Sequence, residues 1–316
     1  MPLDAAQTDT DTTAALALGR GLTVASIRTA AGVGLGLRTA RGVLDVAAAA
    51  AVQGWAPPLT TDDFVNGRGD IDALKTMASA VESGADWTSP FLIPESEVRF
   101  APVVADPGKV ICVGLNYRAH ADEANLGAPT DPILFNKFRS SMNHHRGTIA
   151  VSREPAEKFD YEAELVIVIG RAARAVSEAD ALDYAFGYAC GQDFSARDLQ
   201  KASSQWMLGK CGDGWGPAGP WLVGADLVDP DKLDIQCLVN GEVRQSSNTA
   251  DMIFSCSQII AYASRFMTLL PGDVIFSGTP EGVILGYPPE KQVWLKAGDR
   301  ILTRIEKLGE LEVSLT

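Results

Sequence analysis

Carboxylates alternate with other residues at the entrance to one apolar run, and this run constrains the fold more than any other feature. The sequence reads Asp160-Tyr161-Glu162-Ala163-Glu164 and leads directly into the apolar residues 165–169. Side chains of a strand alternate between its faces, so Glu162 and Glu164 point the same way, roughly 7 Å apart along the strand. The continuous apolar run predicts a strand that is buried on both faces.

Two neighbouring carboxylates at the edge of an apolar core need a counter-charge. They repel each other, and taking both out of water is costly. A divalent cation removes both costs, and oxygen ligands favour Mg²⁺, Mn²⁺ or Ca²⁺ over zinc. Spacing by itself favours a plainer interpretation, a solvated strand end with Glu162 and Glu164 exposed, and leaves the metal site as the alternative.

Asp193 is a candidate third ligand. It follows a run of small and apolar residues, 186–191, and precedes Ser195-Ala196-Arg197. Asp is also a common N-cap, and the sequence alone favours Asp193 as the cap of a helix that begins near Ser195. Both interpretations stay open on spacing alone.

His120 and Glu123 stand three residues apart. In a helix they would share one face, where the carboxylate fixes the tautomer of the imidazole and raises its basicity, as the deprotonation of water requires. A surface pair without function is the alternative. Cations scattered among the acids indicate either an anionic ligand or ordinary charge balance; they are Arg118, Lys137, Arg139, Arg197 and Lys210.

Composition excludes several classes of function. The chain has 316 residues, of which 46% are hydrophobic and 21% charged, and a net charge of −13, which argues against binding to nucleic acid or to an anionic membrane. No apolar stretch is long enough to span a bilayer. The five cysteines form no CxxC motif, which favours free thiols in a reducing cytoplasm and argues against a cysteine-type zinc site. Residues 1–17 are expected to be a disordered lead-in rather than a signal peptide.

The predicted elements indicate an α+β, mostly β protein. Short strands are expected at 24–27, 33–37 and 43–46, and Asp70 is expected to cap a helix over 71–81. Prolines near residue 100 separate a small N-terminal α/β domain, 18–100, from a larger domain, 101–316. The larger domain is expected to hold strands at 110–113 and 165–169, a hairpin turning at Asn240-Gly241, and helices over 181–188 and 253–267.

Taken together, these segments resemble the fumarylacetoacetate hydrolase superfamily over roughly residues 105–316. No single segment is decisive, but the order and density of all of them are specific. The matching segments are 114–118 with His120 and Glu123, Asp160 to Leu165, Gln192 to Gln200, Leu208-Gly209-Lys210, Val239 to Glu242, Asp251 to Ser255, and Gly278-Thr279-Pro280-Glu281-Gly282.

The resemblance implies a mixed β-roll fold, a homodimer and a role for each matching residue. Glu162, Glu164 and Asp193 match the metal ligands, for Mg²⁺ or Mn²⁺, with Ca²⁺ as a substitute in a crystal. His120 with Glu123 matches the pair that activates water, and Lys210 a catalytic lysine. Five residues match positions that bind substrate: Arg118, Lys137 (near the entrance), Arg197, Gln200 and Thr279.

The activity implied is hydrolysis of a C–C bond in a 2,4-dioxo acid, an acylpyruvate, by water activated at His120 and through a metal-stabilised pyruvate enolate. Oxaloacetate decarboxylation and isomerisation of a 2-hydroxy-dienedioate use the same kind of site and are the alternatives. The intact His120–Glu123 pair favours hydrolysis. A catalytically silent metal- or metabolite-binding protein is the second alternative, supported only by altered loops at 143–145 and 211–215.

Overall fold

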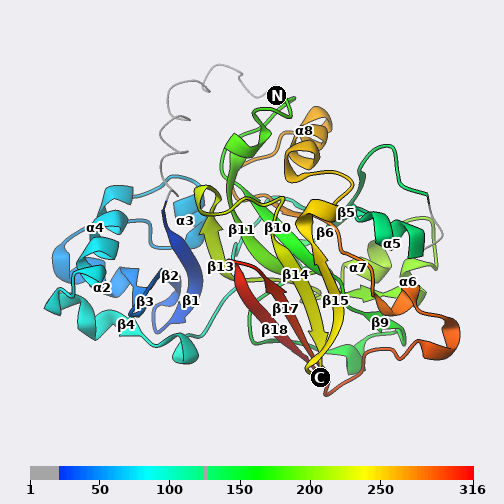
Figure 1. Cartoon of the computed structure of the whole chain (residues 1–316). Coiled ribbons are helices and arrows are strands. Elements are labelled where there is room, and N and C mark those ends of the chain that lie inside the picture. The colour runs from blue at the N-terminus through cyan, green and yellow to red at the C-terminus, as the bar shows by residue number, and fades with distance from the viewer. Residues whose placement is uncertain (1–20, 124–126) are drawn as a thin grey trace, which may run out of the picture.

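A computed structural model describes residues 21–123 and 127–316, with the side chain of Asp122 left out. The expected lead-in, residues 1–17, lies outside the described residues. The protein is mostly β, with mixed sheets that combine antiparallel and parallel pairs (Figure 1).

The largest sheet runs through the whole molecule. Its order is β4-β3-β2-β1-β13-β11-β10-β16-β5-β6, and β7 pairs with β13. The bounds are β1 (Thr23–Thr29), β2 (Gly32–Thr39), β3 (Gly42–Asp45), β4 (Leu92–Ile93), β5 (Val110–Gly114), β6 (Ile133–Lys137), β7 (Met142–Asn143), β10 (Ala163–Ile169), β11 (Ala185–Gln192), β13 (Gly216–Gly224) and β16 (Val274–Phe276).

A second sheet, of order β15-β14-β17-β18-β8, packs against the first. Its strands are β8 (Gly147–Ile149), β14 (Asp234–Val239), β15 (Glu242–Asn248), β17 (Arg300–Ile305) and β18 (Gly309–Leu315), and a small sheet pairs β9 (Phe159–Asp160) with β12 (Ser195–Ala196). The helices are α2 (Val46–Gln53), α3 (Thr61–Val65), α4 (Ile71–Glu82), α5 (Arg118–Glu123), α6 (Arg197–Gln200), α7 (Met207–Lys210) and α8 (Cys256–Phe266).

Strand β10 separates two apolar cores, as its sequence predicts. Alternate side chains, Leu165, Ile167 and Ile169, face the core between the two sheets. Val166 and Val168 face the core shared with the N-terminal strands and helices. Every residue of β10 is buried, so the prediction of burial on both faces is confirmed.

The main sheet continues across the expected boundary near residue 100. Strand β1 pairs antiparallel with β13, with Val24 opposite Leu222, and helices α2 and α4 lie beside the N-terminal strands at the left of Figure 1. The helix after Asp70 is confirmed, since the Asp70 carboxylate accepts hydrogen bonds from two backbone N–H groups. The division into domains at 100 stays a prediction.

The hairpin at Asn240-Gly241 is confirmed, but the helix expected over 181–188 is wrong. Asn240 and Gly241 both have positive φ, 52° and 85°, as a type I′ turn requires. Beyond a short 3₁₀ turn at Ala181–Tyr184, the chain enters β11. A Cβ on Gly187 would lie 2.3 Å from the carbonyl oxygen of Val223, so the chain approaches β13 closely here, and sheet pairing overrides the local helical signal.

Candidate functional site

Three buried carboxylates meet where β10 begins and β11 ends. One oxygen from each of Glu162, Glu164 and Asp193 lies within 4.8 Å of the others. The register brings them together, because Glu164 pairs with Gly191 and the Asp193 N–H donates to the Glu162 carbonyl at 3.0 Å. The alternative for Asp193, a helix cap, is wrong: helix α6 begins at Arg197, and its N-cap is Ala196 without a side-chain bond.

Buried cations neutralise two of the three carboxylates. Lys210 Nζ lies 2.7 Å from Glu162 and 2.8 Å from Asp193, and an Arg197 nitrogen lies 2.7 Å from Glu162. Burial raises the pKa of Glu162, but the charges of Lys210 and Arg197 outweigh it and bring this pKa to about 2. Glu162 is therefore ionised and held by two cations.

The expectation that Lys137 lies near the entrance of the site is wrong. Its side chain is fully buried, and Nζ lies 2.6 Å from Asp193 Oδ1 and also contacts the Lys210 carbonyl. The physical reason is the pleat of β6, which turns Lys137 inward toward the carboxylates.

Glu164 differs from its two neighbours. Its hydrogen bond is to the backbone N–H of Gly278, at 2.8 Å, and among the described residues it has no ion-pair partner. Burial raises its pKa well above the usual value, and the charges of Asp193 and Glu162 raise it further. Three clustered carboxylates with one charge uncompensated fit a hard divalent cation, which takes oxygen ligands.

Two further buried residues, Asp160 and Gln245, hold the segments around the carboxylates in place. The sequence did not single them out as site residues. The Asp160 carboxylate accepts from Arg197 Nε at 2.8 Å and from the backbone N–H groups of Ile284 and Leu285. Gln245 accepts from the backbone N–H of Ala163 and donates to the Thr279 hydroxyl. Asp160 stands in the same run as the ligands, but no local signal marks Gln245.

His120 and Glu123 share one face of α5, as expected. His120 Nδ1 lies 3.5 Å from Glu123 Oε2, and the Glu123 carboxylate accepts from the Gly282 N–H at 3.2 Å. A Cβ on Gly286 would lie 2.0 Å from the Glu123 carboxyl carbon, so this chain turn fits closely around Glu123. With Nδ1 facing the carboxylate, Nε2 is the nitrogen left to accept a proton.

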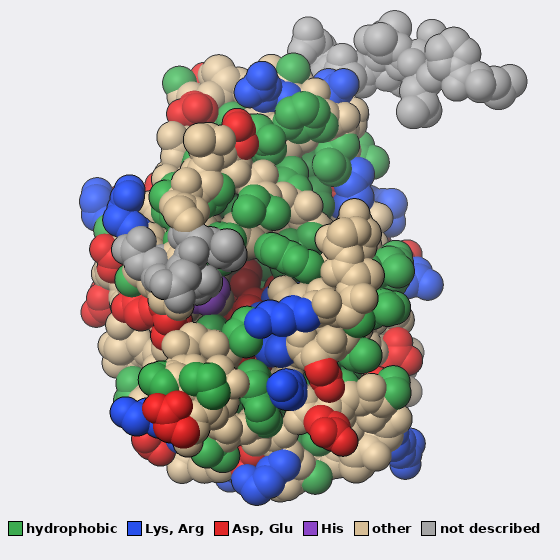
Figure 2. Space-filling model, turned by 90° about the vertical axis from the view of Figure 1, so that its right-hand side faces the viewer, with side chains coloured by type: hydrophobic (Ala, Val, Ile, Leu, Met, Phe, Trp, Pro, Cys, Tyr) green, Lys and Arg blue, Asp and Glu red, His purple; other side chains and the backbone are tan. Residues whose placement is uncertain are grey.

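One pocket of about 210 Å³ is lined by His120 and by two of the carboxylates, Glu162 and Glu164. Figure 2 shows this face of the molecule, with a histidine and acidic side chains deep in a hollow and Lys or Arg side chains along one rim. The predicted residues that line the pocket are His120, Glu162, Glu164, Arg197, Gln200, Lys210 and Thr279. Arg118 is exposed and outside this lining, and its role in binding substrate stays a prediction.

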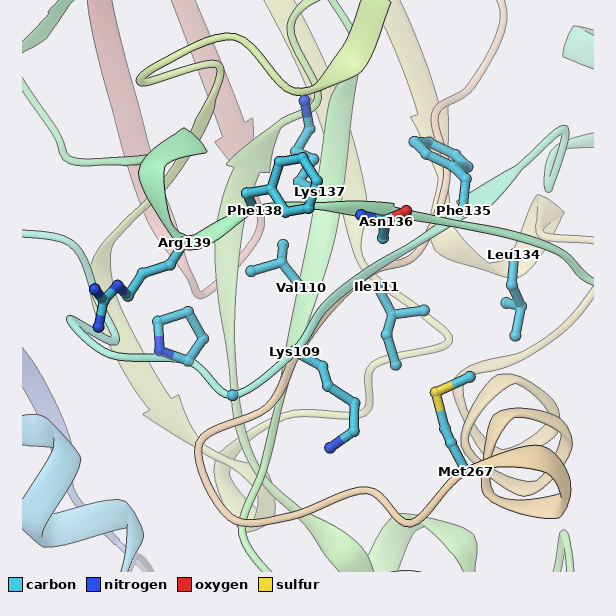
Figure 3. Close-up of a pocket in the computed structure, with 12 residues that line it drawn as sticks. Lys109, Val110, Ile111, Leu134, Phe135, Asn136, Lys137, Phe138, Arg139 and Met267 are labelled. Atoms are coloured by element: carbon cyan, nitrogen blue, oxygen red, sulfur yellow. The ribbon is translucent and has the colours of Figure 1, made fainter. Parts of the chain in front are cut away.

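A second cavity, of about 460 Å³, lies between β5, β6 and the end of α8 (Figure 3). Ile111, Leu134 and Met267 gather on one side of it. Its three cations are already paired, Lys109 with Asp273, Lys137 with Asp193 and Arg139 with Asp106. Its described lining holds no carboxylate and no histidine, so it lacks the groups that the smaller pocket offers for chemistry.

Residues 109–316 match the family described as fumarylacetoacetate (FAA) hydrolase C-terminal. This chain belongs to that family. It is an enzyme of the family, and the expected fold class is confirmed.

Relatives that are named for different activities are similar to this chain. The protein named oxaloacetate tautomerase fahd2, mitochondrial, of Xenopus laevis is 42% identical over 76% of this chain and 73% of that protein. The 2,4-didehydro-3-deoxy-L-rhamnonate hydrolase of Sphingomonas sp. (strain SKA58) is 43% identical over 76% of this chain and 84% of that protein.

A solved structure to which this chain is similar contains a divalent metal. The maleylpyruvate hydrolase of Sphingobium sp. SYK-6, in complex with manganese (II) ion and pyruvate, has a TM-score of 0.71 and 30% identity, covering 93% of this chain and 98% of that chain.

Among the described residues, no helix has the length and hydrophobicity to cross a membrane.

Proposed function

We propose that this enzyme interconverts the keto and enol forms of oxaloacetate, with Mg²⁺ or Mn²⁺ held by Glu162, Glu164 and Asp193. The observation that carries the proposal is that His120 lines the same pocket, of about 210 Å³, as Glu162 and Glu164. The reaction moves one proton between carbon and oxygen, and one base next to a centre of positive charge is sufficient for it. The relative from Xenopus laevis that is named for this reaction supports the choice.

His120 is the residue that moves the proton. Nε2 takes a proton from the carbon next to the keto group, the C–H electrons form the new C=C bond, and the carbonyl π electrons move to oxygen. The same imidazole returns the proton to that oxygen. The Glu123 carboxylate, 3.5 Å from Nδ1, stabilises the imidazolium formed between the two transfers.

A divalent cation would supply positive charge beside the oxygen on which negative charge develops. The chain itself holds ligand carboxylates and His120 around one enclosed pocket. Arg197 and Lys210 fix the direction of the Glu162 carboxylate, and the Gly278 N–H fixes that of Glu164. Because the site is buried, each of these interactions is stronger than in water.

Hydrolysis of an acylpyruvate is the second candidate, and the His120–Glu123 pair favours it. Hydrolysis uses the same base but adds a water molecule, which His120 would deprotonate for attack on the distal carbonyl. The C–C bond then breaks and releases pyruvate and a carboxylic acid. Relatives named as hydrolases support this candidate, and the experiment below tests it beside tautomerisation.

The test is an assay of the metal-stripped protein after addition of Mn²⁺ or Mg²⁺. We expect metal-dependent loss of the ultraviolet absorbance of enol-oxaloacetate without release of pyruvate. Pyruvate and a carboxylic acid formed from a panel of acylpyruvates, with no tautomerisation, would replace the proposal by hydrolysis. CO₂ release from oxaloacetate as the only reaction would make the enzyme a decarboxylase.

A further inference from the structure

The buried cations of the pocket already form ion pairs with carboxylates of the protein. Arg197 is paired with Asp160 and Glu162, and Lys210 with Glu162 and Asp193. All of these side chains are buried. An arginine or lysine held by two carboxylates has little attraction left for a further anion, because its charge is neutralised at hydrogen-bond distance.

Lys201 is the remaining cation that lines this pocket. It directly follows α6 and its residue is exposed. Across residues 21–123 and 127–316, no carboxylate forms an ion pair with it. A lysine at the mouth of an enclosed pocket, with its charge uncommitted, is available to an anionic group of a bound molecule.

The position of Lys201 is fixed by the close approach of α6 and α7. A Cβ on Gly209 would lie 2.4 Å from the backbone nitrogen of Gln200, so only glycine allows this contact. The backbone N–H of Lys201 donates to the Arg197 carbonyl at 3.2 Å. The base of the lysine side chain is therefore anchored next to the buried ion pairs, while its ammonium group stays movable.

Aromatic rings restrict the size of what Lys201 can reach. Trp206 and Phe135 line the same pocket, with ring centroids 5.3 Å apart at 68°. A Cβ on Gly114 would lie 2.5 Å from the Trp206 ring, so this ring is packed tightly against β5. A pocket of about 210 Å³ with this wall suits a short acid.

We propose that Lys201 binds the distal carboxylate of a short 2-oxo dicarboxylic acid and so selects dicarboxylates over monocarboxylates of the same length. This inference rests on the proposed function. In that arrangement the 2-oxo end faces the three ligand carboxylates, and the second carboxylate faces the mouth of the pocket. A hydrogen bond to a charged partner strengthens binding by about tenfold to a hundredfold.

The experiment compares Lys201→Gln and Lys201→Arg with the unaltered protein, all loaded with Mn²⁺. Two probes are used, oxaloacetate and 2-oxobutanoate, which has a methyl group in place of the distal carboxylate. Calorimetry gives Kd for each probe, and the tautomerase assay gives KM and kcat for oxaloacetate. Lys291→Gln, at an exposed lysine outside this pocket, is the matched control.

We expect Lys201→Gln to raise Kd and KM for oxaloacetate by about tenfold or more, with Kd for 2-oxobutanoate unchanged. Lys201→Arg should restore most of the lost affinity, and Lys291→Gln should bind both probes like the unaltered protein. Equal Kd values for oxaloacetate in the unaltered protein and Lys201→Gln would overturn the inference. So would an equal loss for both probes.

The binding measurement separates this inference from the proposed function. If oxaloacetate binds through Lys201 but is not tautomerised, the proposed function is wrong and the role of Lys201 stands. If oxaloacetate is tautomerised and Lys201→Gln binds it normally, the role of Lys201 is wrong and the function stands. Absence of oxaloacetate binding to the unaltered protein would overturn both.

Discussion

The carboxylate cluster and the His120–Glu123 pair meet at one pocket but are built in different ways. The carboxylates lie where two central strands, β10 and β11, meet. All three are buried, and two of them are paired with buried cations. His120 and Glu123 stand on the short helix α5, are partly exposed, and are held mainly by the Gly282 N–H. The first region is built for a fixed charge and the second for a group that exchanges protons.

The largest expected effect is that of Glu164→Gln, which removes the carboxylate that has no cation partner of its own. Affinity for Mn²⁺ should fall by more than about 100-fold. Substitution of residues that only contact a metal ligand already lowers metal affinity by about 10–100-fold, and loss of a ligand itself should lower it further. Turnover should become undetectable. Calorimetric titration checks this, with Glu290→Gln at an exposed position as control, and unchanged Mn²⁺ affinity would remove Glu164 from the ligand set.

His120→Asn should damage the other region alone. We expect kcat to fall by about 10²–10⁴, the usual contribution of a general base, while the affinity for Mn²⁺ stays that of the unaltered protein. Steady-state kinetics and titration of the same sample check both halves. Near-normal kcat would show that another group moves the proton.

Asn116 links the two regions, so Asn116→Ala should destabilise the fold. Asn116 precedes α5, and its amide donates to the Ser277 carbonyl at 2.7 Å and accepts from the Phe254 N–H at 2.8 Å. Ser277 is followed by Gly278, whose N–H binds Glu164. Loss of these buried bonds should lower the free energy of unfolding by about 2–3 kcal/mol. Urea unfolding measures it, and a loss under about 0.5 kcal/mol would contradict the link.

Glu123→Gln should have a milder effect than loss of the histidine. The amide keeps the side chain's shape but removes the charge 3.5 Å from the imidazole. We expect kcat to fall about tenfold, equivalent to about 1.4 kcal/mol, with Mn²⁺ affinity preserved. A loss as large as that of His120→Asn would mean that Glu123 itself transfers the proton.

The smallest effect lies away from both regions, at His145. Burial, with smaller contributions from Arg146 and His144, lowers the pKa of His145 to about 4, and its Nδ1 accepts from the Glu312 N–H at 3.1 Å. As the pH falls, the unfolded chain takes up this proton before the folded chain does. The contribution of His145 to stability is therefore fully present above about pH 6.5 and is lost as the pH falls to about 4.

For this partly exposed group the loss should be about 1–2 kcal/mol. Unfolding in urea at pH 7 and pH 4.5 checks it by comparing the unaltered protein with His145→Gln. The variant should lose less stability on acidification. Identical losses would show that other groups cause the acid sensitivity, and both samples should be free of metal, so that the carboxylate cluster is in the same state.

The sequence by itself determined the local features of this protein. The alternation of Glu162 and Glu164 before an apolar run, the helix after Asp70 and the turn at Asn240-Gly241 each depend on neighbours in the chain. The placement of His120 and Glu123 on one helix face is of the same kind. Sterics, pleating and capping act over a few residues, so a sequence pattern carries them.

Only the tertiary structure decided which distant groups meet. The pairing of β10 with β11 brings Asp193 to Glu162, the fold turns Lys137 inward, and it leaves Glu164 without a cation among the described residues. The same sheet overrode the helix expected beyond residue 184, because Gly187 had to approach β13. Charge compensation and close approach depend on long-range register, and that register is set by the burial of whole faces rather than by any short segment.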